Sequence, residues 1–177
     1  MQKRNLGKSM KVSSVGLGCM GITHASGTPL TKAEGMKVLE SALEIGYNFF
    51  DTAECYTGTN PDGTVAYNEE VVGAVLKPVR NKVILASKCG VTHGKDHLIM
   101  DSIRKALEGS LKRLGTDYID LYYQHRIDPK VEPEEVAGTM SDLMKEGKIR
   151  AWGISETDEA YLRRAHSVCP VTAIQNR

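Results

Sequence analysis

The chain has 177 residues, 41% of them hydrophobic and 25% charged, which suits one domain with a core of its own. A net charge of +1 gives no reason to expect nucleic acid or an anionic membrane as a partner, and no apolar run reaches the ~20 residues that span a bilayer. The cysteines lie far apart and the N-terminus lacks the apolar run of a secretory signal, so we expect a cytoplasmic protein with free thiols.

Short apolar runs alternate with helical patterns along the whole chain. After a hairpin over residues 4–12, the predicted strands are 12–18, 47–51, 83–88, 118–124, 149–154 and 171–174. The predicted helices between them are 31–46, 68–77, 98–115, 133–147 and 157–167. Strands that alternate with helices at this spacing form a parallel sheet. No linker or change of composition divides residues 1–177, so we expect a single domain.

Several residues mark where these helices begin. Thr31-Lys32-Ala33-Glu34 is a capping box, and Pro133 stands at a first helical position, where its missing N–H costs nothing. Asn68 is predicted to cap its helix through its side chain. The segment before it, residues 57–67, is expected to be a long polar loop.

Three of the predicted strands end in polar residues. Asp51, Lys88 and His125 end the second, third and fourth strands and are equally spaced along the sequence. Because neighbouring parallel strands end at one edge, these side chains are expected to meet there. Tyr56 follows Asp51 in the next loop. A tyrosine is a poor proton donor at neutral pH, since its ordinary pKa is ~10, so a cation close by would help it by stabilising the phenolate.

Two architectures agree with this order of elements: an open doubly wound sheet, and an incomplete α/β barrel of the (β/α)8 TIM type. Gly16-Leu17-Gly18-Cys19-Met20-Gly21 imitates a dinucleotide-binding fingerprint. Those glycines should open directly into a helix, but here the helix begins only at Thr31, after Pro29. The barrel explains more, because its functional groups belong at the C-terminal strand ends, where Ser155 also falls. We therefore expect an N-terminal hairpin and about six parallel strands with helices outside.

These motifs resemble those of the aldo-keto reductase family, in its bacterial and plant branch. The resemblance covers the whole chain and is carried by Gly16–Gly21, Phe50–Tyr56, Asn68-Glu69-Glu70, Ala86-Ser87-Lys88, Asp117–Asp128 and Trp152–Glu156. It implies a barrel enzyme that uses NADPH to reduce a small carbonyl substrate, an aldehyde or ketone, by hydride transfer.

The resemblance also implies a catalytic set of Asp51, Tyr56, Lys88 and His125. Tyr56 would give a proton to the developing alkoxide, and Lys88 would make that phenol more acidic. Asp51 would pair with Lys88 and fix its position. His125 would donate a hydrogen bond to the carbonyl oxygen.

The same resemblance implies a set of cofactor contacts. Met20 and Gly21 would border the nicotinamide, and Asp51 would also contact the cofactor. Ser155 and Gln175 would hold the carboxamide of the nicotinamide.

Taken singly, some of these residues have simpler structural explanations. Asp51 could cap a turn, Ser155 could cap the helix near residue 157, and Gln175 could be the polar end of a strand. His93 and His97 are four residues apart, but Gly94 lies between them and no third ligand is near, so we expect no metal.

Length is the point at which the chain departs from the family. A complete member is roughly twice as long and closes eight strands. An unclosed barrel would leave its first and last strands as open edges, which could drive self-association. The alternative to a reductase is thus a truncated, non-catalytic half-barrel that lacks most of the cofactor site and acts only by association.

Overall fold

A six-stranded parallel sheet forms the centre of the computed structural model, which describes residues 1–24, 27–89 and 100–176. Its strands run in the order β10-β9-β8-β7-β4-β3. Their bounds are β3 Leu17–Gly18, β4 Phe49–Asp51, β7 Ile84–Cys89, β8 Ile119–Gln124, β9 Ile149–Ser155 and β10 Ala173–Gln175. Two antiparallel hairpins accompany it: β1 Lys3–Leu6 with β2 Met10–Ser13, and β5 Thr57–Thr59 with β6 Val65–Tyr67.

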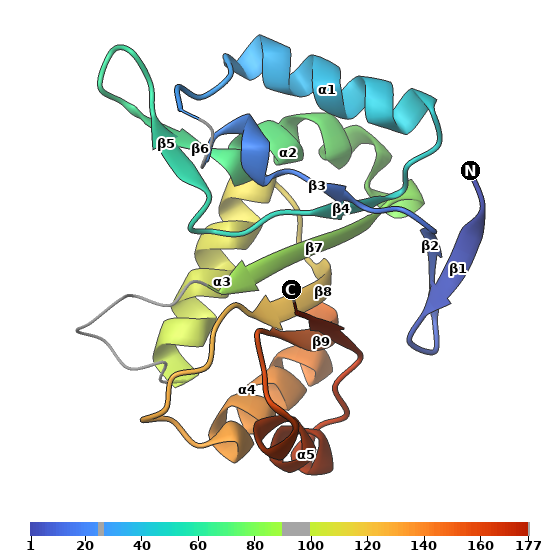
Figure 1. Cartoon of the computed structure of the whole chain (residues 1–177), viewed down its shortest axis with the longest axis vertical. Helices are drawn as coiled ribbons and strands as arrows, with labels where there is room; N and C mark the ends of the chain where they lie inside the picture. The colour runs from blue at the N-terminus through green and yellow to red at the C-terminus, as the bar shows by residue number, and fades with distance from the viewer. Residues whose placement is uncertain (25–26, 90–99, 177) are drawn as a thin grey trace.

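Helices connect the strands of the sheet and cover one of its faces (Figure 1). They are α1 Lys32–Glu44, α2 Asn68–Leu76, α3 Met100–Leu114, α4 Pro133–Lys145 and α5 Glu159–Val168, with 3-10 turns η1 Met20–Ile22 and η2 Lys77–Lys82. The main core lies between this helical layer and the sheet. Each α-helix contributes to it a side chain that is fully or almost fully buried: Leu39, Val72, Leu107, Met140 and Ala165. In the described part of the chain, no helix is both long and apolar enough to cross a membrane.

The strand order decides between the two architectures. Strands β3, β4, β7, β8, β9 and β10 follow one another across the sheet in the order of the sequence. A doubly wound sheet reverses direction at its first strand, whereas a barrel adds each strand on the same side. The prediction of an incomplete (β/α)8 barrel, with a hairpin followed by six parallel strands, is therefore confirmed.

The other face of the sheet carries a second, smaller apolar cluster. The hairpin β1–β2 contributes Met10 and Val12, which are packed with Leu121 and Tyr123 of β8. In Figure 1 this hairpin lies at the end of the sheet opposite the arrowhead of β7. The turn of the hairpin reaches the last βα unit, since a methyl group added at Gly7 would meet the side chain of Thr172. The hairpin therefore covers the end of the sheet where the strands begin.

The predicted strand over residues 12–18 was wrong in extent. The backbone bends after Ser13, and only Leu17–Gly18 pairs with the sheet. Ser13 explains the break, because its N–H donates to Asn48 Oδ1 and its hydroxyl donates to the carbonyl of Val15. These side-chain and backbone hydrogen bonds replace the ladder of backbone hydrogen bonds that a continuous strand would make.

The predicted polar loop over residues 57–67 was also wrong, because it contains the hairpin β5–β6. Its turn is closed by bonds from Gly63 N to Asn60 O (2.9 Å) and from Asn60 N to Thr64 O (2.8 Å). Gly63 has φ +83°, a left-handed conformation that favours glycine. Asp62 accepts bonds from the backbone N–H and the hydroxyl of Thr64. Polar composition concealed a turn sequence that joins two short strands.

A buried carboxylate ties the strands together near the hairpin end. Asp120 on β8 is fully buried and accepts a bond from Leu85 N of β7 (2.9 Å). The same side chain pairs with Arg80 (2.7 Å) and with Arg150 of β9 (3.0 Å). Both guanidinium groups lie 4.0 Å from the ring centroid of Tyr118. Asp120 therefore links two arginines and three neighbouring strands.

Candidate active site

Polar side chains gather at the C-terminal ends of the parallel strands. Asp51 is the last residue of β4, Lys88 the last but one of β7, and His125 directly follows β8. Ser155 and Gln175 are the last residues of β9 and β10. These five positions form one rim of the sheet, and for Asp51, Lys88, His125 and Ser155 the sequence predicted this placement.

Lys88 is the centre of this rim. Only 1% of its surface is exposed. Its ammonium forms an ion pair with Asp51 and donates to the carbonyl of Thr52 (2.8 Å) and to the hydroxyl of Tyr56 (3.2 Å). An ammonium has three N–H donors, so these partners account for all of them. The cation is thus fixed beside the phenol.

Tyr56 is held by its backbone and its ring. Its carbonyl accepts bonds from Asn68 N (3.0 Å) and from the hydroxyl of Thr23 (3.1 Å). Its ring stacks on His24, with centroids 5.8 Å apart, and meets the ring of His125 edge-on at the same distance. The phenol therefore sits between two imidazoles and above the ammonium of Lys88.

Asn68 supports this arrangement, and its predicted role as a helix cap was wrong. Tyr67 occupies the N-cap position of α2, and no side chain caps the helix. The buried amide of Asn68 donates to Cys19 O (2.8 Å) and Thr23 Oγ1 (2.9 Å) and accepts from Thr52 Oγ1 (2.7 Å). It ties together the segments that follow β3 and β4, which surround Tyr56.

His125 is a neutral imidazole at neutral pH. Burial and the nearby positive charges of Lys88 and Arg126 lower its pKa to about 4. A neutral imidazole carries one N–H donor and one acceptor nitrogen. Its Nδ1 lies 3.4 Å from the sulfur of Cys55.

Asp51 has one oxygen with a partner and one without. Burial raises the pKa of Asp51, while the ammonium of Lys88 and the amide of Gln175 oppose this shift. Oδ1 pairs with Lys88, whereas the buried Oδ2 has no hydrogen-bond partner among the described residues. An unpaired buried carboxylate oxygen is an acceptor available to a ligand hydroxyl.

The predicted carboxamide contacts lie side by side at the ends of β9 and β10. Ser155 is buried, and its hydroxyl donates to the backbone carbonyl of Gln175 (3.1 Å) and accepts from Arg126 (3.1 Å). Ser155 does not cap α5, because Asp158 does so through its bond with Tyr161 N. One lone pair of the Ser155 hydroxyl stays free among these contacts.

Met20 and Gly21 lie in η1, next to the rim. The preceding residue, Cys19, donates its backbone N–H to the carbonyl of Asp51 (2.8 Å). Met20 is 40% exposed, and a methyl group added at Gly21 would meet nothing within 4 Å. This segment therefore leaves open space beside the strand ends.

Sequence reasoning missed three residues of this region: Cys55, Asn68 as a buried support, and Arg126. Their contacts join segments far apart in the chain, so the pattern of strands and helices does not reveal them, although all three lie in stretches that carry the family resemblance. His93 and His97, the disfavoured metal pair, lie outside the described residues. Within the described ranges, no group of three or more His, Cys, Asp or Glu side chains is arranged to hold a metal ion.

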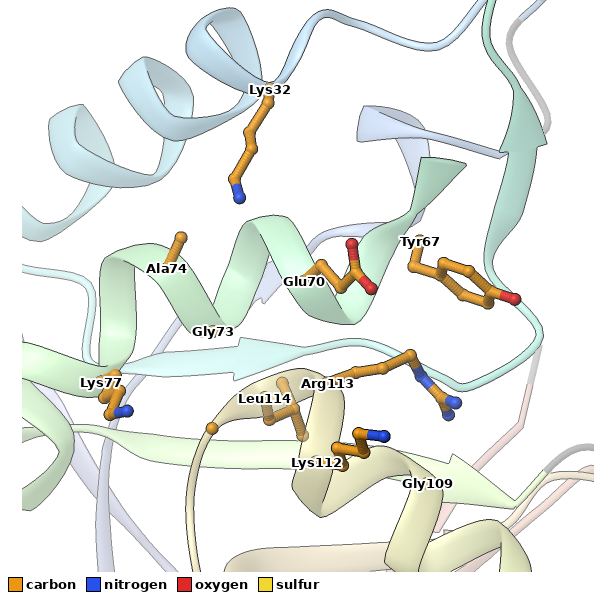
Figure 2. Close-up of a pocket in the computed structure, with 11 residues that line it drawn as sticks. Lys32, Tyr67, Glu70, Gly73, Ala74, Lys77, Gly109, Lys112, Arg113 and Leu114 are labelled. Atoms are coloured by element: carbon orange, nitrogen blue, oxygen red, sulfur yellow. The ribbon is translucent and has the colours of Figure 1, made fainter. Parts of the chain in front are cut away.

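A separate groove of about 580 Å³ lies away from the rim, on the helical layer (Figure 2). It runs between α2 and α3, with Gly73 and Leu114 at its base and Lys32 of α1 above. Lys77 and Lys112 also line it, together with Glu70 and Arg113. None of the predicted site residues contributes to this groove.

Parallel strands in sequential order, with helices outside and polar side chains at the C-terminal ends, define a protein of the TIM-barrel type. The family model for the aldo/keto reductase family matches residues 14–177. The chain belongs to the aldo/keto reductase family.

Among curated relatives, the chain is similar to "Probable aldo-keto reductase 1" of Glycine max, with 40% identity over 95% of this chain and 48% of the relative. It is also similar to "Aldo-keto reductase str7" of Strobilurus tenacellus, with 39% identity over 97% of this chain and 50% of the relative. The chain thus spans about half the length of these relatives.

Solved structures agree with this assignment. The thermostable aldo-keto reductase Tm1743, solved with the inhibitor epalrestat, has a TM-score of 0.85 and 32% identity, covering 100% of this chain and 62% of its own. The holo form of aldo-keto reductase AKR11C1 from Bacillus halodurans has a TM-score of 0.81 and 33% identity, and the match covers 100% of this chain and 57% of that structure's chain.

Proposed function

We propose that this chain carries the catalytic groups of an NADPH-dependent reductase that converts aldehydes and ketones to alcohols. The observation that carries the proposal is the buried ammonium of Lys88, which pairs with Asp51 and lies 3.2 Å from the hydroxyl of Tyr56. A buried cation aimed at a phenol is what a tyrosine needs in order to act as a proton donor.

The residues at the rim fit a nicotinamide cofactor. The unpartnered Oδ2 of Asp51 would accept a bond from a ribose hydroxyl. The free lone pair of Ser155 would accept from the carboxamide NH2, and the exposed side-chain amide of Gln175 would complete the contact. Met20 and Gly21 would border the ring beside the open space at η1. The family resemblance favours NADPH as the form that binds.

Tyr56 has the central role in the proposed reaction. When bound, the nicotinamide supplies the hydride that adds to the carbonyl carbon. Tyr56 gives its hydroxyl proton to the oxygen that becomes the alcohol, and Lys88 stabilises the phenolate left behind. Asp51 keeps the ammonium of Lys88 at the phenol through their ion pair.

His125 acts on the same oxygen. Its neutral ring lies 5.8 Å from the ring of Tyr56 and carries one N–H, which would donate to a carbonyl oxygen held beside the phenol. A fixed donor of this kind stabilises the negative charge that develops on oxygen.

Replacing the proton donor tests this proposal. We expect Tyr56→Phe to lower the rate of NADPH oxidation with p-nitrobenzaldehyde by ~100-fold or more, while NADPH binding is retained. Tyr47→Phe is the matched control, because the Tyr47 hydroxyl makes no hydrogen bond within the described residues and lies on the core side of the chain. Full activity of Tyr56→Phe would contradict the proposed role.

The alternative is a non-catalytic half-barrel that acts by association. It is favoured by the position of β10 at an end of the described sheet, where Ile174 is 49% exposed. An open strand edge can pair with another chain. No NADPH binding at millimolar concentration, together with oligomers in sedimentation, would favour this alternative; a monomer that binds NADPH would exclude it.

A further inference from the structure

Cys55 contacts His125 across the mouth of the site. It lies directly before Tyr56, in a turn closed by a bond from Tyr56 N to Ala53 O (3.1 Å). The bond from Glu54 N to Lys88 O (3.3 Å) holds this turn against β7. The sulfur of Cys55 lies 3.4 Å from Nδ1 of His125, within the reach of a hydrogen bond to sulfur. The contact is therefore built on a fixed backbone.

The chemistry of the two groups makes this contact consequential. A neutral imidazole carries its proton on either Nδ1 or Nε2, and the hydrogen bond at one nitrogen decides the state of the other. The Cys55 thiol is exposed on one side, yet desolvation on the other and the carboxylate of Glu54 raise its pKa. It stays an S–H group at neutral pH and is able to donate.

The titratable and charged groups near His125 lie on several segments of the described chain. Lys88 lies on β7, Arg126 follows His125 in the chain, and His24 stacks on Tyr56 from the segment after η1. These groups disfavour a second proton on the ring of His125, which therefore stays neutral. Cys55 can then affect only which of the two ring nitrogens carries the single proton.

We propose that Cys55 is a positioning residue whose thiol donates to Nδ1 of His125, keeps the single proton on Nε2, and so presents Nε2–H to a substrate carbonyl oxygen. The effect of Cys55 on catalysis rests on the proposed function, whereas the tautomer of His125 does not depend on it. The reverse arrangement, with Nδ1–H donating to sulfur, would leave Nε2 as an acceptor that repels a carbonyl oxygen.

Nitrogen-15 NMR of the histidine rings tests the tautomer without turnover. The chain has five histidines, and the signals of His125 are assigned by their loss in His125→Gln. We expect protonated Nε2 and bare Nδ1 in the unaltered chain and in Cys55→Ser, whose hydroxyl is a stronger donor. In Cys55→Val, which fills similar space without a donor, both ring nitrogens should shift toward a mixture. Cys169→Ala, on the far end of α5, should leave the His125 signals unchanged.

Kinetics provide the second measurement. Cys55→Val should lower kcat roughly five-fold with little change in KM, and Cys55→Ser should restore it, because one oriented hydrogen bond is at stake. A protonated Nδ1 in the unaltered chain, or His125 signals that are identical in Cys55→Val, would overturn the proposal. The expected shift in a chain with no reductase activity would instead leave the tautomer assignment standing and remove the proposed function.

Discussion

His125 is a residue whose protonation should be visible in the stability of the whole chain. Its pKa falls to about 4 in the folded protein from an ordinary 6.5. Between these values the unfolded chain binds a proton that the folded chain does not, so the free energy of unfolding falls as the pH drops through this window. The loss is complete once the pH is below about 4. We expect this loss of unfolding free energy to be about 2 kcal/mol, after allowance for the partial exposure of the His125 ring.

The measurement is urea denaturation of the unaltered chain and of His125→Gln from neutral pH down to about 4. The carboxyl group of Asp51, whose pKa is raised, titrates in both proteins and therefore cancels in the comparison. The unaltered chain should lose more stability than the variant. Parallel curves would show that His125 is not held neutral by its surroundings.

At this scale the sequence predicted the residues whose position follows from strand ends. Asp51, Lys88 and His125 each fall where a parallel strand stops, and the structure brings the first two into an ion pair. Asn68 and Cys55 could not be predicted in the same way. Their partners Cys19 and His125 are far away in sequence, and only the folded loops bring them together.

At the scale of elements, the packing of α2 against α3 depends on Gly73. A methyl group at this position would lie 2.5 Å from the carbonyl oxygen of Leu114 and 2.7 Å from two other backbone atoms of that residue. Backbone atoms cannot move aside cheaply, so Gly73→Ala should destabilise the protein by about 1–3 kcal/mol.

Gly138, in the interior of α4, provides the matched control for this prediction. A methyl group there would meet nothing within 4 Å. Alanine forms helices better than glycine does, so Gly138→Ala should raise the free energy of unfolding by up to about 1 kcal/mol. Changes of opposite sign in the stability of Gly73→Ala and Gly138→Ala, measured by thermal or urea denaturation, would support the close approach of α2 and α3. Equal gains for both variants would refute it.

The elements themselves were predictable where strong local signals exist. The capping box at Thr31 and the proline at the start of α4 locate two helices correctly. The sequence was misleading where side chains compete with the backbone. Ser13 breaks a strand through its own hydrogen bonds, and Asn60–Thr64 folds a polar segment into a hairpin turn. These outcomes depend on hydrogen bonds that an apolar pattern does not report.

At the scale of the whole molecule, the C-terminal ends of the strands and the hairpin end of the sheet have different roles. Polar groups with perturbed pKa values lie at the C-terminal ends, while Asp120 clamps the strands toward the hairpin end. Removing its charge would leave Arg80, which is mostly buried, without its partner. Asp120→Asn should therefore lower the free energy of unfolding by about 3 kcal/mol.

Asp142→Asn is the control for the clamp, because its pair with Lys145 is exposed on α4. Its effect should stay within about 0.5 kcal/mol. Urea denaturation of both variants, side by side, measures the difference. A similar small effect for Asp120→Asn would mean that the buried pairs contribute little to holding β7, β8 and β9 together.

The order of strands in the sheet bears on how the chain is made by the ribosome. Each parallel strand pairs with the one synthesised just before it, so every βα unit leaves the exit tunnel beside a neighbour that already exists. The hairpin β1–β2 is the exception, because its turn at Gly7 rests against Thr172, which is synthesised only after β9. The hairpin must therefore wait until β3 to β9 have been synthesised before its turn reaches this contact.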